Sequence, residues 1–319
     1  MPDVPVELMA PDISPYKRSA TGTPYVHIFE SGKPGPKVLV VALTHGNEIC
    51  GAIALDRWLR SGARPSRGAL TLAFANVEAF SRFDPKRPFA TRFVDEDMNR
   101  VWTREALEGS RKTAELDRAR ELRPYVEAAD YMLDIHSMLE PSPPVMISGP
   151  LDKGVRFARE VAIPEHIVCD AGHANGTRMR DYQGFGDQKS AKNALLVECG
   201  QHWEHAAAHV AWQGLWRFLR VVDLVDPQAA EREIDAAPPP AQKVIRVTDA
   251  VIAHSPEFRF AREFTGLAVV AKRGDVIAWD GEAAVRAPYD NCVLVMPVPH
   301  NVKTGLTAVR LGRFDPPPA

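Results

Sequence analysis

Two histidines and a glutamate stand directly after apolar runs that are typical of buried strands. His45 and Glu48 lie three residues apart after the apolar run 38–43, and His136 follows another such run. Two imidazoles and one carboxylate are the ligand set of a catalytic zinc, which keeps a fourth position open for water. Gly46 allows a tight turn between the strand and the following helix. We therefore predict that His45, Glu48 and His136 bind one Zn²⁺ per chain; ordinary polar turn residues and a core histidine are the alternatives.

A second carboxylate, Glu198, closes the otherwise apolar run 194–197. Burying a carboxylate is costly unless it is paired or functional. Beside a zinc-activated water it could accept the proton and later return it to the leaving nitrogen. Asp134 precedes His136 by two residues, so both side chains point to the same face of a strand and Asp134 could accept the imidazole N–H. A structural ion pair is the alternative interpretation of Glu198.

The charged segment 92–100 (RFVDEDMNR) offers groups that bind anions. Asn99 and Arg100 place an amide and a guanidinium side by side, which suits a substrate carboxylate. Arg92 could polarise the scissile carbonyl and stabilise the oxyanion. A solvated charged loop is the alternative, and the neighbouring metal ligands favour the functional interpretation.

A rival metal cluster has helical spacing: His202, His205 and His209, with Glu204 among them. Such a stripe is more often a mildly polar helix face, so we do not assign the metal to it. The sequence holds no GxSxG elbow, Walker loop or GxGxxG fingerprint, so neither a serine hydrolase nor a nucleotide-binding protein is indicated.

Strand-like runs alternate with amphipathic helices from residue 37 to about 225, which predicts an α/β fold with a mixed sheet flanked by helices. In such sheets, ligands bind at the carboxyl ends of the strands, where the candidate metal ligands and Glu198 stand. Strands are expected over 38–43, 70–75, 131–135, 145–148, 167–169 and 194–198, and helices over 48–60, 113–128 and 203–225.

The polar stretch 226–242, with prolines at 238–240, reads as a linker. Beyond it, short β-type runs at 244–247, 258–262, 275–278 and 292–298 are separated by turn residues. We expect a catalytic domain over 1–226 and a small all-β domain, a barrel or a sandwich, over 243–319 that covers the cleft.

Composition excludes several classes of protein. The chain has 319 residues, 45% hydrophobic and 25% charged, with a formal net charge of −2, so nothing indicates a nucleic-acid partner. No apolar run approaches the roughly 18 residues of a membrane span, and the N-terminus lacks a signal-peptide core. Four scattered cysteines without a CxxC pair predict reduced thiols and a cytoplasmic protein. Assembly as a homo-oligomer stays open.

The motifs HGNE, RFVDEDMNR, DIHS and VECG, with Asn76 at a strand end, resemble in order and separation the succinylglutamate desuccinylase/aspartoacylase family. That family belongs to the zinc carboxypeptidase-like hydrolases, and the resemblance covers roughly residues 37–225. It implies zinc on His45, Glu48 and His136, Glu198 as general base and acid, Arg92 at the oxyanion, and Asn99 and Arg100 on the substrate carboxylate.

The resemblance also implies a reaction: hydrolysis of the amide bond of an N-acyl amino acid, a small-molecule substrate. One feature of this chain differs from the family pattern, and the position of one further family residue stays open. Where aspartoacylases carry an arginine for a second substrate carboxylate, this chain reads Asp-Gln-Lys at 187–189, and Lys189, Arg178 and Arg180 are open substitutes. Tyr289 is the candidate for a tyrosine that reaches the site from the β domain.

We therefore expect a cytoplasmic zinc-dependent amidohydrolase, a deacylase of small N-acyl amino acids. A metallocarboxypeptidase acting on short peptides is the alternative within the same fold. A non-catalytic binding module is the alternative outside enzymes, but no ligand or base of the candidate site has been lost.

Overall fold

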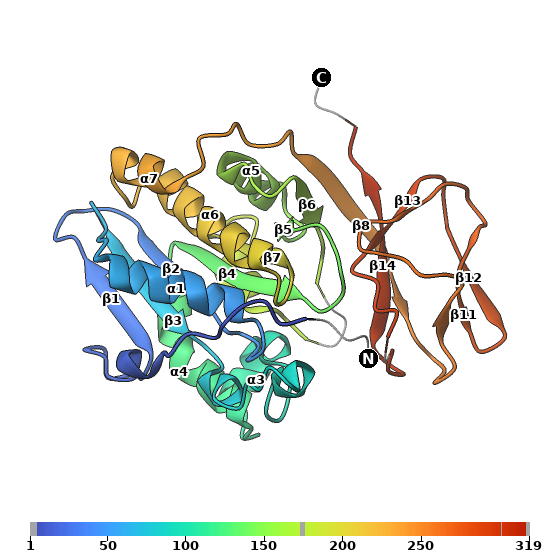
Figure 1. The fold of residues 1–319 in the computed structure, drawn as a ribbon, viewed down its shortest axis with the longest axis horizontal. Helices are drawn as coiled ribbons and strands as arrows, with labels where there is room; N and C mark the ends of the chain where they lie inside the picture. Colours follow the sequence, from blue (N-terminus) through green and yellow to red (C-terminus); the bar gives the residue numbers. More distant parts are fainter. Residues whose placement is uncertain (1–4, 173–175, 301, 317–319) are drawn as a thin grey trace.

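One mixed β-sheet runs through most of the chain (Figure 1) in the computed structural model, which describes residues 5–172, 176–300 and 302–316. Its strand order is β1-β3-β2-β4-β7-β5-β6-β8-β14-β13-β10, and a separate small sheet has the order β12-β11-β9. The strands are β1 (Val26–Glu30), β2 (Lys37–Ala42), β3 (Ala69–Phe74), β4 (Tyr131–Met138), β5 (Val145–Ile147), β6 (His166–Cys169), β7 (Asn193–Gln201), β8 (Lys243–Ile252), β9 (Arg259–Phe260), β10 (Val269–Val270), β11 (Val276–Asp280), β12 (Ala283–Arg286), β13 (Cys292–Val295) and β14 (Thr307–Phe314).

The helices flank this sheet (Figure 1). They are α1 (Ile49–Ser61), α2 (Val77–Phe80), α3 (Arg104–Glu108), α4 (Ala114–Ala128), α5 (Asp152–Val161), α6 (His205–Val221) and α7 (Pro227–Glu233), with short 3-10 turns at Ser14–Tyr16, Pro88–Thr91, Met98–Arg100, Met179–Asp181 and Gln183–Gly186. In the described ranges no helix is both long and apolar enough to cross a membrane.

The centre of the sheet is parallel: β2 pairs in parallel with β3 and β4, and β4 with β7. β1 and β5 run antiparallel to their neighbours β3 and β7, so the sheet is mixed. The predicted fold class, an α/β mixed sheet flanked by helices, is confirmed. Because parallel strands end at the same edge, the residues that follow β2, β4 and β7 are brought together.

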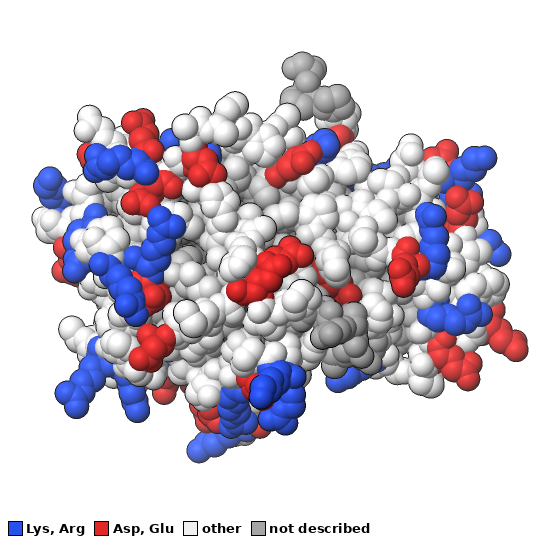
Figure 2. Space-filling model, in the orientation of Figure 1, with Lys and Arg blue, Asp and Glu red and all other residues white. Residues whose placement is uncertain are grey.

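Helices cover both faces of the central strands, which explains why β2 is apolar throughout. Val38 and Val40 of β2 face the core cluster shared with α1 and α6, whereas Leu39 and Val41 face the cluster shared with α4. Residues of a strand alternate between its faces, so a strand buried on both sides needs a continuous apolar run. The surface is mixed in charge: on the face shown in Figure 2, acidic and basic side chains are interspersed.

Sequence patterns missed some elements, of which α5 is the clearest. This helix contains Gly154, and glycine normally argues against a helix interior. A Cβ at Gly154 would lie 2.0 Å from the carbonyl oxygen of Ser148, so the glycine lets α5 pack directly against the end of β5. The predicted helix 203–225 is also shorter than expected, because α6 begins at His205 and ends at Val221.

The stretch 226–242, which the sequence indicates as a linker, contains a helix in its first half, where α7 forms. Asp226 caps this helix by accepting from the backbone N–H of Ala229 (2.9 Å), and Pro227 occupies its first turn. An N-cap aspartate followed by proline is a local helix-start signal that outweighs the polar composition. The remaining segment, 235–242, has no helix or strand.

The C-terminal strands continue the main sheet, because β8 pairs in parallel with β6. An apolar cluster joins Val168 and Leu196 to Ile245, Val293 and Val295 across this boundary. The division into domains 1–226 and 243–319, whose outermost residues lie outside the described ranges, stays a prediction.

Limited proteolysis with elastase, which cleaves after small residues, is expected to cut within 235–242 and to spare α7. Residues 235–241 are exposed and outside regular structure, so few stabilising contacts are broken when this segment enters the active site of a protease. The two fragments should nevertheless co-elute in native size-exclusion chromatography, because the β6–β8 pairing and its apolar cluster remain. Fragments that separate without denaturant, or cuts inside α7 identified by mass spectrometry, would contradict this expectation.

Candidate metal centre and active site

The three predicted metal ligands meet at the carboxyl edge of the parallel strands. His45 lies in the turn after β2, Glu48 occupies the N-cap position of α1, and His136 lies near the end of β4. His45 Nδ1 is 2.7 Å from Glu48 Oε1, and His136 Nδ1 is 2.7 Å from Glu48 Oε2. One ligand atom from each residue lies within 4.8 Å of the others, and all three side chains are buried. This geometry suits a single ion.

Gly46 has a different role from the one expected. Its φ is not positive, so the turn does not need left-handed backbone. Instead, a Cβ there would lie 2.5 Å from the backbone nitrogen of Phe80 and from the carbonyl oxygen of Thr91. The N–H of Gly46 donates to the carbonyl of Arg92 (2.9 Å), so this glycine lets the Arg92 segment pack onto the metal turn.

Each histidine turns its other ring nitrogen toward a carboxylate. His45 Nε2 lies 2.9 Å from Asp97 Oδ1, and His136 Nε2 lies 2.8 Å from Asp134 Oδ2. Thr44 Oγ1 donates to the second oxygen of Asp134 (2.8 Å), which fixes that carboxylate. Such carboxylates hold the proton on Nε2 and leave the Nδ1 lone pair for a metal. Asp97 was not assigned a role from the sequence, although it lies in the acidic run before Asn99.

The electrostatics of the three proposed ligands also favour a bound cation. Burial lowers the pKa of His136, but Asp134 and Glu48 outweigh it and hold this pKa well above its ordinary value. Burial raises the pKa of Glu48, but His45 and His136 outweigh it and hold this pKa well below the ordinary value. Glu48 is therefore ionised, and the raised pKa of His136 shows that positive charge is stabilised between the carboxylates of Glu48 and Asp134. A divalent cation can supply this positive charge in place of the imidazole proton, so the residues present fit a metal.

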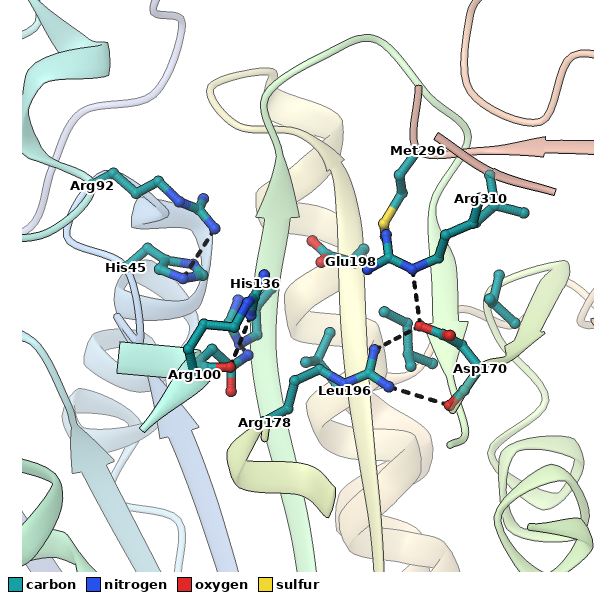
Figure 3. A pocket seen from close by; sticks show the side chains of 14 residues that line it. His45, Arg92, Arg100, His136, Asp170, Arg178, Leu196, Glu198, Met296 and Arg310 are labelled. Atoms are coloured by element: carbon teal, nitrogen blue, oxygen red, sulfur yellow. Dashed lines mark hydrogen bonds and ion pairs between the residues drawn. The ribbon is translucent and has the colours of Figure 1, made fainter. Parts of the chain in front are cut away.

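Glu198 stands beside the cluster without belonging to it. It lies in β7 directly opposite His136 in the parallel register of β4 and β7, as Figure 3 shows from the side of the small cavity. Burial, followed by the negative charge of Glu48, raises the pKa of Glu198 to about 7 against the attraction of His136 and Arg92. A carboxylate with a pKa near 7 can both accept and release a proton near neutral pH.

This raised pKa predicts a pH-dependent stability of the metal-free protein. A carboxyl whose pKa rises from 4.5 to about 7 on folding stabilises the fold below pH 4.5, and that contribution is lost as pH rises toward 7. The loss is on the order of 3 kcal/mol. Glu198→Gln should therefore be more stable than the parent at pH 8 and nearly equal at pH 5, measured by urea unfolding. A gap between the two proteins that does not change with pH would contradict the assigned burial cost.

Arg92 points its guanidinium at the metal cluster. Nη1 lies 3.2 Å from Glu48 Oε1, and Nη2 lies 3.4 Å from Asp97 Oδ2. Figure 3 shows the contact of Nη2 with His45 Nε2, at 3.0 Å. The side chain is 36% exposed, so it also reaches the cavity. A half-buried guanidinium in this place can donate to an oxygen that becomes negative during reaction.

Asn99 and Arg100 are only partly available to a ligand. Asn99 is buried, and its Oδ1 accepts from the backbone N–H of Met179 (2.9 Å), so the amide nitrogen, 3.5 Å from His136 Nε2, is the group left to donate. Arg100 donates to the carbonyl of Asn99 (2.8 Å) and lies 3.7 Å from Asp97. It lines both cavities described below.

Tyr289 contacts other residues of the C-terminal region, and its sequence-based assignment to substrate binding stays a prediction. Its hydroxyl lies 2.6 Å from Thr248 Oγ1, and the Arg313 guanidinium stacks over its ring at 3.7 Å. It lines neither cavity described here. The tyrosine packs instead against β8 and β14, because its aromatic ring and hydroxyl both find partners there.

A small cavity of about 50 Å³ adjoins the cluster, and it gathers guanidinium groups that the sequence left scattered. Arg310 of β14 and Arg178 both contact Asp170: Arg178 Nη1 lies 3.0 Å and Arg310 Nε 3.3 Å from Asp170 Oδ2 (Figure 3). Arg178 also pairs with Asp181 at 2.7 Å. The cavity is lined by His45, Arg92, Asn99, Arg100, His136, Ile147, Val168, Asp170, Arg178, Leu196, Glu198, Val295, Met296 and Arg310.

Sequence reasoning missed Asp170 and Arg310 and left Arg178 as one of three open candidates. Of the others, Arg180 is buried and donates to the carbonyls of Ser148 (2.9 Å) and Ala194 (2.6 Å). Lys189 is exposed and lines neither cavity. No local pattern could single out Arg310, because its position depends on β14 joining the main sheet.

The rival histidine cluster does not converge. His202 is buried with Nδ1 2.8 Å from Ser137 Oγ, and burial lowers its pKa to about 3. His205 and His209 are on α6, and His209 pairs with Asp235 near the surface (2.9 Å). Among the described residues, the group able to hold a metal is His45, Glu48 and His136.

Comparison with known proteins places this chain in a family. The succinylglutamate desuccinylase/aspartoacylase catalytic domain matches residues 34–210, more than half of the chain, so the chain belongs to that family. It is 40% identical over 87 residues to a probable aspartoacylase of Parasynechococcus marenigrum (strain WH8102), covering 27% of this chain and 26% of that protein. It is 29% identical over 138 residues to the N-acyl-aromatic-L-amino acid amidohydrolase (carboxylate-forming) of Xenopus laevis, covering 40% and 42%.

Solved structures share the fold. The succinylglutamate desuccinylase of Chromobacterium violaceum superposes with a TM-score of 0.66 at 18% identity, covering 93% of this chain and 91% of that one. The matches to the two curated relatives span about a quarter and less than half of their lengths. The fold is therefore shared over nearly the whole chain, whereas the family match covers residues 34–210.

Proposed function

We propose that this chain is a zinc-dependent amidohydrolase that removes the acyl group from a small N-acyl amino acid or a related amide. One observation carries the proposal: two histidine Nδ1 atoms and Glu48 converge in a buried cluster, while Glu198 stands beside them. Membership of a family named for a desuccinylase and an aspartoacylase supports a deacylase.

The proposed metal is one Zn²⁺ per chain, held by His45, Glu48 and His136. When bound, zinc would supply Lewis acidity to an attacking water and to the scissile carbonyl. Two imidazoles and a carboxylate are a common protein ligand set for a catalytic zinc. The carboxylates of Asp97 and Asp134 orient the two rings for this purpose.

The remaining side chains move protons and hold the substrate. Glu198 accepts a proton from the attacking water and donates it to the leaving nitrogen, which becomes the free amine. Arg92 donates to the carbonyl oxygen as it becomes negative. Arg100, with the amide nitrogen of Asn99, binds the carboxylate of the amino acid, and the guanidinium of Arg178 adds positive charge to the same small cavity.

Arginine substitutions should separate binding from chemistry. Arg100→Ala is expected to raise KM mainly, because a carboxylate clamp acts in the ground state and the transition state alike. Arg92→Ala is expected to lower kcat by roughly 10²-fold, because it donates to charge that develops only during reaction. Steady-state kinetics on zinc-loaded protein decides between the roles. The opposite pattern would mean that the roles of Arg92 and Arg100 are exchanged. No effect from either substitution would favour the alternative that segment 92–100 is a solvated charged loop.

Metal analysis and a substrate panel test the proposed function directly. Purified protein should contain one zinc per chain, and amine release should be measured on N-acyl amino acids and on short peptides. Release from N-acyl amino acids supports the deacylase, whereas release from peptides alone would indicate the carboxypeptidase. Zinc-loaded protein that releases no amine from N-acyl amino acids or from short peptides would indicate a non-catalytic binding module. A cytoplasmic location and a homo-oligomeric state stay predictions.

A further inference from the structure

A second, wider cavity of about 670 Å³ opens beside the small one. Arg92, Arg100 and Glu198 line both cavities, so a molecule in the wide cavity reaches the same reaction centre. A volume of this size is typical of sites for drug-sized ligands. An acetyl group would fill only a small part of it.

Apolar side chains from distant segments form the walls of the wide cavity. Phe89 and Phe93 come from the segment before the predicted carboxylate clamp, Met138 from the end of β4, and Val298 and Leu306 from the C-terminal region. Phe93 is 39% exposed and Leu306 is 49% exposed, which places two large apolar groups in water when the cavity is empty of ligand. Covering them with an apolar group would be favourable.

The charged side chains indicate which cavity binds the amino-acid half of the substrate and which binds the acyl half. Arg178 lines only the small cavity and Arg100 lines both, so we assign the carboxylate of the amino acid to the small cavity. Burial, with smaller contributions from the neighbouring arginines and against the attraction of Asp97, lowers the pKa of Arg100 to about 10. The acyl half of the substrate is then left for the wide cavity.

A charged acyl group would be poorly placed in the wide cavity. Glu140 lies in its wall with the carboxylate 3.2 Å from His300 Nδ1, and Glu96 adds a second carboxylate. Lys303 and Arg310 also line this cavity, but Arg310 already contacts Asp170. A succinyl carboxylate would have to leave water for walls that are mainly apolar, and this is costly.

From the volume, the apolar walls and the separation of charge, we propose that this enzyme prefers a bulky apolar acyl group, such as a hexanoyl or phenylacetyl group, over acetyl or succinyl. This inference rests on the proposed deacylase activity. Each methylene buried is worth about fourfold in affinity. Going from acetyl to hexanoyl adds four methylenes, so kcat/KM should rise by roughly 250-fold if all four are buried and by roughly 15-fold if only two are.

The test compares N-acetyl-, N-succinyl- and N-hexanoyl-leucine, repeated with glutamate, on the zinc-loaded full chain. The hexanoyl compounds are expected to have the highest kcat/KM. Leu306→Ala and Phe93→Ala should each lower the hexanoyl-to-acetyl ratio by about three- to tenfold. Val269→Ala is the matched control, because Val269 is a large apolar residue, 44% exposed, that lines neither cavity. The hexanoyl-to-acetyl ratio of kcat/KM for this variant should equal that of the parent.

Calorimetric binding of the same compounds to Glu198→Gln keeps the two proposals apart. Tighter binding of the hexanoyl compounds without turnover by the parent protein would overturn the proposed activity and support the apolar acyl cavity. Turnover with equal kcat/KM for acetyl and hexanoyl compounds, or with succinyl preferred, would overturn the acyl preference and leave the activity standing. Unchanged ratios in both Leu306→Ala and Phe93→Ala would also overturn it.

Discussion

Glu198→Gln is expected to lower kcat by about 10²–10⁴ while the protein keeps its zinc and still binds substrate. Glutamine preserves the shape of the side chain at this half-buried position of β7 and can still form hydrogen bonds. It cannot accept a proton from water or return one to the leaving nitrogen. The measurement is kcat on the best substrate of the panel, with zinc content determined on the same samples.

The pH profile gives this variant a second signature. Because burial raises the pKa of Glu198 to about 7, the parent holds the base form above that pH and loses it below. A zinc ion nearby lowers this pKa, so the acidic limb of the parent should lie at or below pH 7. The residual rate of Glu198→Gln should lack that limb. A variant with parental turnover and full zinc would show that another group is the base, and Asp134 would be tested next.

Loss of any proposed ligand should remove zinc, and His136→Ala is expected to have the largest effect. His136 is 1% exposed and lies between the carboxylates of Glu48 and Asp134. Without the imidazole, two buried carboxylates face each other with fewer ligands for a cation, so zinc affinity and the free energy of unfolding should both fall. His45→Ala and Glu48→Ala should lower bound zinc in the same way, since a catalytic zinc usually has three protein ligands.

His209→Ala is the matched control for the ligand substitutions. His209 is a histidine of the rival stripe, exposed on α6 and paired with Asp235. Its zinc content should equal that of the parent in metal analysis after dialysis. Stoichiometric zinc in all three ligand variants, or loss of zinc in His209→Ala, would show that the metal has been assigned to the wrong residues.

The residue types and their places along the chain were enough to predict the core of the site. His45, His136 and Glu198 each follow or end an apolar run, and such runs form parallel strands whose carboxyl ends meet at one edge. The register of β4 and β7 then sets His136 opposite Glu198, as expected for strands of one sheet. The fold class followed from the same alternation of strands and helices.

Only the tertiary structure decided which side chains complete the site. Asp170 and Arg310 are 140 residues apart and meet because β14 pairs with β8, which pairs with β6. Tyr289 shares that C-terminal region but turns toward Thr248 and Arg313 instead. Contacts of this kind depend on strand order and register over the whole sheet. Local periodicity specifies which face of a strand is buried, but it contains no information about which distant strand lies beside it.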